Sequence, residues 1–283
     1  MNISLSSFIY LNYPLGEALE RIAQAGYDGI DIWGGRPHAY RKDLNHTQIS
    51  KLAEQSRALG LTVASFIPAQ FRYPTCLCSP SDKVRRDSVN YIKDGLDAAA
   101  EFGAPLVSVC PGHTLFGQEL KDGWDRLLDS LNEICSAASR LGLRVALEPA
   151  DKYETDLVNT CEQAIQVIED SGLDNLGVVL DNGHSYVVGE RAEEVVRRLG
   201  DRLYHVHLDD NNGRRDQHLI PGDGNFDFIP FLAALRDCGY SGFLTAELSW
   251  DYTIDPDQAA RAANTRVREY LQAVEGSVSA GKR

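Results

Sequence analysis

The sequence predicts an α/β fold, a (β/α)8 TIM barrel in a single domain. Short apolar runs alternate eight times with longer amphipathic segments, and no linker or low-complexity stretch divides the 283 residues. Parallel strands buried on both faces have this apolar character, and eight strand–helix units with right-handed crossovers can close into a barrel. No Gly-x-Gly-x-x-Gly turn follows the first run, which disfavours the alternative of a doubly wound open sheet.

Strands are predicted where short apolar runs are rich in β-branched residues. These runs cover residues 2–8, 28–33, 62–67, 105–110, 143–148, 176–181, 203–208 and 243–248. Amphipathic helices are predicted near 14–25, 46–59, 80–102, 122–141, 159–171, 189–199, 227–238 and 256–274. The barrel is therefore expected over residues 1–274, and segment 275–283 is expected to be a flexible tail.

Residues at the helix boundaries support this division. Ser79-Pro80 and Asp255-Pro256 have the order of an N-cap followed by a proline at the first helical position. Glycines are predicted to end four helices, at Gly60, Gly103, Gly142 and Gly239.

The composition argues against a nucleic-acid partner and a membrane location. The formal net charge of −13 repels phosphate backbones. No stretch approaches 18 apolar residues, and the first residues lack the basic region of a signal peptide. The six cysteines are scattered, with no second close pair to complete a zinc site. A reduced, cytoplasmic protein is expected.

Metal-binding residue types stand at the ends of four consecutive predicted strands, where a TIM barrel carries its active site. They are Glu148, Asp181, His207 and Glu247. Each alone also fits a polar strand end or a helix cap, but three carboxylates in one mouth repel one another unless a cation lies between them. The set suits one divalent cation per chain, Mn²⁺, Mg²⁺ or Co²⁺, rather than a closed structural zinc. His205 faces the same side one layer deeper and is interpreted as a core histidine.

These strand ends resemble the metal site of the xylose-isomerase-like TIM barrel family, which includes sugar isomerases, ketose 3-epimerases and endonuclease IV. The matching segments are ALEP, VLD, HVH and TAEL, and the resemblance covers essentially the whole chain. Within the family, IWGGRPHA (32–39) and DQHLIPGDG (216–224) resemble the fructoselysine 3-epimerases. The D-tagatose and D-allulose 3-epimerases are the other similar group. The resemblance implies a metal-dependent 3-epimerase that inverts C3 of a ketose or a fructosamine.

The resemblance also assigns the chemistry. Glu148 and Glu247 are implied as the acid and base that remove a proton from C3 and return one to the opposite face. Charge on the resulting cis-enediolate is stabilised by the cation, which acts as a Lewis acid. Glu154, six residues after Glu148, and His184, three after Asp181, are implied to contact the substrate.

Further substrate contacts are expected from loops at the barrel mouth. The family uses an arginine beyond the seventh strand, and Arg214 or Arg215 fills this role here. Loop position also places Trp33, His38, His113, Asp216 and His218 at the substrate site. Trp33 equally fits ordinary packing, and His38 equally fits a solvated loop.

Other functions use parts of the same pattern. An aldose–ketose isomerase or a keto-sugar dehydratase would need the same ligands, whereas a non-catalytic sugar-binding barrel would not need the Glu148–Glu247 pair. An endonuclease IV-like nuclease is disfavoured because SFIPAQ and CPG lack the expected histidines at the third and fourth strand ends. A homo-oligomer, dimer or tetramer, is expected from the resemblance.

Overall fold

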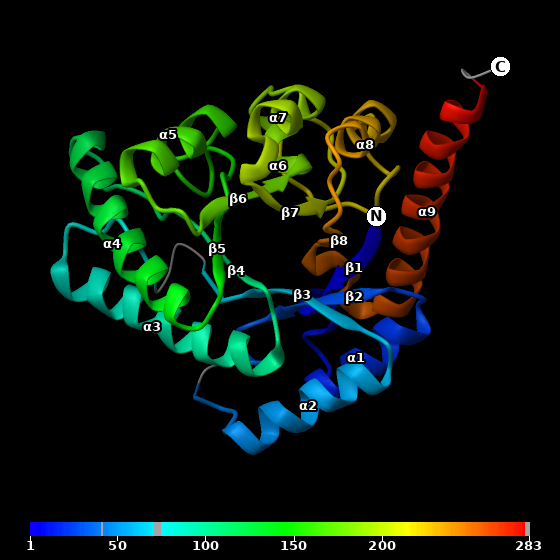
Figure 1. Cartoon of the computed structure of the whole chain (residues 1–283), viewed down its shortest axis with the longest axis horizontal. Helices are drawn as coiled ribbons and strands as arrows, with labels where there is room; N and C mark the ends of the chain where they lie inside the picture. The colour runs from blue at the N-terminus through cyan, green and yellow to red at the C-terminus, as the bar shows by residue number, and fades with distance from the viewer. Residues whose placement is uncertain (41, 71–74, 281–283) are drawn as a thin grey trace.

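The computed structural model describes residues 1–40, 42–70 and 75–280. Within them, eight parallel strands pair in sequence order and the last pairs with the first, so the sheet is the closed barrel that the sequence predicts (Figure 1). The strands are β1 (Asn2–Ser6), β2 (Gly29–Trp33), β3 (Thr62–Ile67), β4 (Leu106–Val109), β5 (Arg144–Leu147), β6 (Leu176–Asp181), β7 (Leu203–Leu208) and β8 (Phe243–Ala246).

Helices surround the barrel on its outside (Figure 1). They are α1 (Leu15–Gln24), α2 (His46–Ala58), α3 (Asp82–Phe102), α4 (Leu120–Arg140), α5 (Cys161–Ser171), α6 (Asn182–Val187), α7 (Ala192–Leu199), α8 (Phe228–Asp237) and α9 (Pro256–Ala280), with 3-10 turns η1 (Ser7–Tyr10), η2 (Gly200–Arg202) and η3 (Trp250–Ile254). Their apolar faces, such as Leu131 and Ile134 of α4, are fully buried. This burial supplies the main stabilisation of the fold. None of the described helices combines the length and apolar character that a membrane crossing requires.

Several element boundaries differ by a few residues from the prediction, and at two of them a short polar side chain caps the backbone. β1 ends at Ser6 rather than at residue 8, since the Ser6 hydroxyl accepts a backbone N–H and the chain turns into η1. Ser81, not Ser79, is the N-cap of α3, and its hydroxyl accepts from the backbone N–H three residues on.

The predicted helix-ending glycines all have positive φ, at Gly60, Gly103, Gly142 and Gly239. Only glycine adopts this left-handed conformation without strain, so the prediction is confirmed. α9 begins at Pro256, as predicted, and continues to Ala280. It thus enters the segment 275–283 that was expected to be a flexible tail, and residues 281–283 lie outside the described part of the chain.

The parallel pairing brings the predicted ligands to one end of the barrel. Asp181 at the end of β6 pairs in register with His207 on β7. Glu148 and Glu247 directly follow β5 and β8, and the backbone N–H of each bonds to the neighbouring strand. The four side chains therefore leave the wall at the same level, over the C-terminal ends of four adjacent strands.

Candidate functional site

Four predicted ligands converge at the barrel mouth. Ligand atoms of Glu148, Asp181, His207 and Glu247 all lie within 4.8 Å of one another. Nδ1 of His207 is 2.7 Å from Oε1 of Glu148, 3.0 Å from Oε2 of Glu247 and 4.0 Å from Oδ2 of Asp181. One imidazole nitrogen thus faces three carboxylates from three other strands.

The electrostatics of this cluster fit a divalent cation. Oδ2 of Asp181 is buried without a hydrogen-bond partner. Burial raises the pKa of Asp181, and the charges of Asp216 and Glu148 add to this effect. Burial lowers the pKa of His207, but the carboxylates of Glu247 and Glu148 outweigh it and raise that pKa well above its ordinary value. The cluster therefore attracts positive charge, and its oxygen-rich donor set matches hard to borderline cations.

The two glutamates also border an open cavity. A cavity of about 280 Å³ is lined by Glu148, Glu247, Trp33 and Trp250, among others. Oε2 of Glu148 accepts a hydrogen bond of 3.3 Å from Ser108. Because Glu148 and Glu247 come from strands on different sides of His207, a small molecule in this cavity would meet two carboxylates.

A second polar cluster lies beside the first and contains three predicted substrate residues. Oδ2 of Asp216 is 2.6 Å from Nε2 of His218 and 3.5 Å from Nδ1 of His184. Nδ1 of His218 is 3.2 Å from the buried Asp209. Burial raises the pKa of Asp209, and the charges of Asp181 and Asp216 raise it further. Burial lowers the pKa of His184, but Asp216 and Asp181 raise it by more, to about 9. All three predicted residues line the 280 Å³ cavity.

A short helix, absent from the prediction, places His184. Asp181 is the N-cap of α6, because its Oδ1 accepts from the backbone N–H of His184 at 2.9 Å. Asp181 thus uses one oxygen for the cap and directs the other into the cluster. Aspartate is a favoured N-cap residue, so Asp181 at the end of a predicted strand could have indicated a helix start from the sequence.

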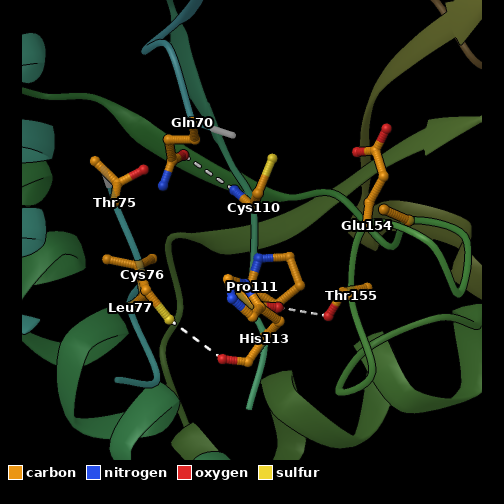
Figure 2. Close-up of a pocket in the computed structure, with 11 residues that line it drawn as sticks. Gln70, Thr75, Cys76, Leu77, Cys110, Pro111, His113, Glu154 and Thr155 are labelled. Atoms are coloured by element: carbon orange, nitrogen blue, oxygen red, sulfur yellow. Dashed lines mark hydrogen bonds between the residues drawn. The ribbon is translucent and has the colours of Figure 1, made fainter. Parts of the chain in front are cut away.

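A side cavity of about 420 Å³ adjoins the first one. Figure 2 shows the residues that line it. Gln70, Cys110 and Glu154 line both cavities. The Gln70 side chain accepts a hydrogen bond of 3.0 Å from the backbone N–H of Cys110, which fixes the shared wall. The side cavity also contains the predicted residue His113, whose carbonyl accepts from the Cys76 thiol at 3.3 Å. The two adjoining cavities together thus offer a ligand more room than the cavity around Glu148 and Glu247 alone.

Three residues predicted to contact the substrate lie elsewhere. Arg214 is exposed and is absent from the lining of both cavities, and Arg215 is exposed with its guanidinium 5.4 Å from the ring centre of Tyr153. His38 does not reach the site either, because it is only 2% exposed and its side chain turns inward from the loop that follows β2. Its Nδ1 is 3.0 Å from the Ser7 hydroxyl, and Nε2 is 3.1 Å from the carbonyl of Tyr10. His38 therefore joins two segments of the scaffold.

This buried position makes His38 a source of acid sensitivity. Burial lowers the pKa of His38 from 6.5 to about 4. The unfolded chain then binds more protons than the folded one between these values, so stability is lost as the pH falls below 6.5. We expect this group to cost about 2 kcal/mol of unfolding free energy between pH 7 and pH 5. In urea unfolding, the loss of unfolding free energy between pH 7 and pH 5 should be smaller by that amount in His38→Gln. His46→Gln is the control, because His46 is exposed, and its loss should match that of the wild type.

Several residues at the site carried no recognised signal in the sequence. Phe8 and Trp250 line the 280 Å³ cavity with their ring centres 4.6 Å apart, and Cys76 and Gln70 line the side cavity. Single apolar side chains are common on protein surfaces, and a lone cysteine or glutamine in a loop indicates no particular site. Only the folded arrangement shows that they share a cavity with the glutamates.

Comparisons with known proteins agree with the barrel fold. Residues 19–270 match the family model described as xylose isomerase-like TIM barrel. The chain is 31% identical over 258 residues to fructoselysine 3-epimerase of Escherichia coli O157:H7, an alignment that covers 91% of this chain and 94% of that protein. A crystal structure of a D-tagatose 3-epimerase-like protein superposes with a TM-score of 0.84 at 26% identity, covering 98% of this chain and 100% of the other. A crystal structure of IOLI protein with a bound zinc atom has a TM-score of 0.82 at 23% identity, with 97% and 99% covered, and shows the shared fold.

Proposed function

The chain belongs to the xylose isomerase-like TIM barrel family, and we propose that it is a divalent-metal-dependent 3-epimerase of a ketose or a fructosamine. The observation that carries this proposal is the pairing of Glu148 and Glu247. Both lie at the cluster that fits a cation, and both border one cavity. A protein that only bound sugars would not need two carboxylates at the same point, whereas inversion of a carbon needs an acid and a base.

In this proposal all four residues of the cluster hold the cation, and two of them also exchange protons with the substrate. Glu148, Asp181, His207 and Glu247 hold the cation, which supplies positive charge that stabilises a developing enediolate. Glu148 and Glu247 exchange protons with C3 from opposite faces of the substrate. Burial raises the pKa of Glu247, but His207 outweighs it and lowers that pKa. A cation held by the same residues would supply the positive charge in place of the charged imidazole, so Glu247 would be ionised at neutral pH and ready to accept a proton.

The substrate is held by the residues that border the cavity around these glutamates. His184, Asp216 and His218 supply a hydrogen-bonding wall on one side, and the Trp33 ring supplies an apolar one. Glu154 stands where this cavity meets the side cavity. A ketose reacting at the glutamates would therefore have room for a substituent that extends past Glu154 into the side cavity. This space favours a substituted ketose such as fructoselysine over a free hexose.

We expect a larger side chain in the side cavity to change substrate preference. Cys76→Met would fill part of the space next to His113. The kcat/KM for fructoselysine should therefore fall by about 10-fold, which is the lower end of the effect that one methylene group has in an apolar substrate pocket. The value for D-fructose should stay near that of the wild type. Cys238→Met is the matched control, because Cys238 is an exposed free thiol. An equal loss for both sugars would contradict a substituent site in this cavity.

The proposed reaction is tested by NMR in D₂O with metal-loaded protein, a panel of ketoses and fructoselysine, beside an EDTA-treated sample. Metal-dependent deuterium uptake at C3 together with a new epimer is the expected result. Exchange at C1 or C2 without C3 would instead identify an aldose–ketose isomerase. Absence of exchange with every sugar would contradict the proposal.

A further inference from the structure

A buried carboxylate, Asp31, lies beneath the cation cluster on a strand that carries none of the ligands. Asp31 is on β2 and is fully buried. Its Oδ2 is 2.7 Å from Nε2 of His205 and accepts from the Ser65 hydroxyl at 2.6 Å. Its Oδ1 accepts from the Thr245 hydroxyl at 3.0 Å. Contacts with β3, β7 and β8 thus fix this carboxylate in one orientation.

The fixed carboxylate faces the second nitrogen of His207. Nδ1 of His207 points to the glutamates. Nε2 makes no hydrogen bond to any group in the described chain, and the Oδ2 atom of Asp31 lies 3.4 Å from it. A neutral imidazole that donates its lone pair to a cation through Nδ1 must carry its proton on Nε2. The group that receives this proton decides which nitrogen is free for the cation.

We propose that Asp31 is a positioning residue that keeps the proton of His207 on Nε2 and so presents Nδ1 to the cation. This inference rests on the metal dependence proposed above. The Ser65 and Thr245 hydroxyls bond to its two oxygens and hold Asp31 as an acceptor next to His207. A carboxylate in this place makes His207 a stronger ligand, although Asp31 touches neither the cation nor the substrate.

The test measures Mn²⁺ binding, by titration calorimetry and by the electron paramagnetic resonance signal of free Mn²⁺, in wild type, Asp31→Asn and Ser65→Ala. Asparagine has nearly the same shape as aspartate but lacks the charge, so the Kd should rise by about 10- to 100-fold. Ser65→Ala is the matched control, since it removes one donor to the same oxygen and leaves the carboxylate. Its Kd should stay close to that of the wild type.

The outcomes separate this role from a structural one. A merely structural Asp31 would lower the melting temperature in EDTA and leave the Kd unchanged, which would overturn the proposal. Failure of the wild type to bind Mn²⁺ would instead overturn the metal-dependent function, and this inference with it. If Asp31→Asn does not fold, ¹⁵N NMR of Zn²⁺-loaded, ¹⁵N-histidine-labelled wild type decides the question. A proton on Nε2 of His207 is expected, and a proton on Nδ1 would overturn the proposal.

Discussion

Replacing Glu247 with glutamine is expected to lower kcat for C3 epimerisation by about 10²- to 10⁴-fold at saturating metal, the range typical of losing a general acid–base group. Glutamine keeps the size of the side chain and one oxygen for the cation, but it cannot accept the proton of C3. Oε2 of Glu247 lies 3.0 Å from Nδ1 of His207, so the change is made at the centre of the cluster. The rate is measured by NMR on the substrate that the panel identifies.

A sharper result is expected from isotope exchange with the same variant. Glu148 remains in Glu247→Gln, so the C3 epimer whose hydrogen faces Glu148 should still exchange with D₂O, while the other epimer should not. Glu148→Gln should show the opposite preference. Glu154→Gln serves as the control, because Glu154 lies at the rim of both cavities and is not one of the four ligands. Equal loss of exchange for both epimers would contradict a mechanism with two bases.

The sequence predicts the barrel because its physical causes are local. Apolar runs that fit strands buried on both faces recur in every unit, glycines end four of the helices as predicted, and the eight-strand closure follows from the number of units. The exact ends depend on single caps. Ser6 turns the chain into η1 two residues before the predicted strand end, and Ser81 rather than Ser79 starts α3, since each hydroxyl bonds to a particular N–H.

The sequence also predicts which side chains meet at the mouth, since strand ends in a barrel are fixed by pairing. Asp181 and His207 stand in register on adjacent strands, so their proximity follows from the order of the strands. Loop residues carry no such constraint. His38 is two residues from an exposed loop arginine, yet it turns inward to bond with Ser7 and Tyr10, whose positions depend on η1. Periodicity and spacing in the sequence do not show whether a loop side chain such as His38 points inward or outward.

Asp31 shows a further limit of sequence reasoning. An aspartate in an apolar run indicates a buried charge. Such a charge needs a partner, because burying it alone is costly. Its partners Ser65, His205 and Thr245 come from three other strands, and only β3, which carries Ser65, is paired with β2. Interpretation of His205 as a core histidine fits its burial, but the carboxylate that it contacts was recognised only in the folded barrel.

Removal of the metal is expected to abolish turnover and to destabilise the wild-type protein, whereas Asp181→Asn should lose most of this metal response. A metal present at 100 times its Kd stabilises the folded state by about 2.7 kcal/mol. The amide of asparagine retains the oxygen that caps α6 through the N–H of His184 but removes the charged ligand. Urea unfolding of both proteins, with Mn²⁺ and with EDTA, measures the difference.

The order of stabilities should reverse in EDTA. Oδ2 of Asp181 is buried without a hydrogen-bond partner, and burial together with the charges of Asp216 and Glu148 raises its pKa above 3.8. A carboxyl group whose folded pKa exceeds its unfolded value destabilises the folded protein at neutral pH, where it is ionised in the unfolded chain. Asp181→Asn removes this cost, so it should be at least as stable as the wild type in EDTA and less stable in Mn²⁺. A variant that is less stable in both conditions would mean that Asp181 serves the fold rather than a cation.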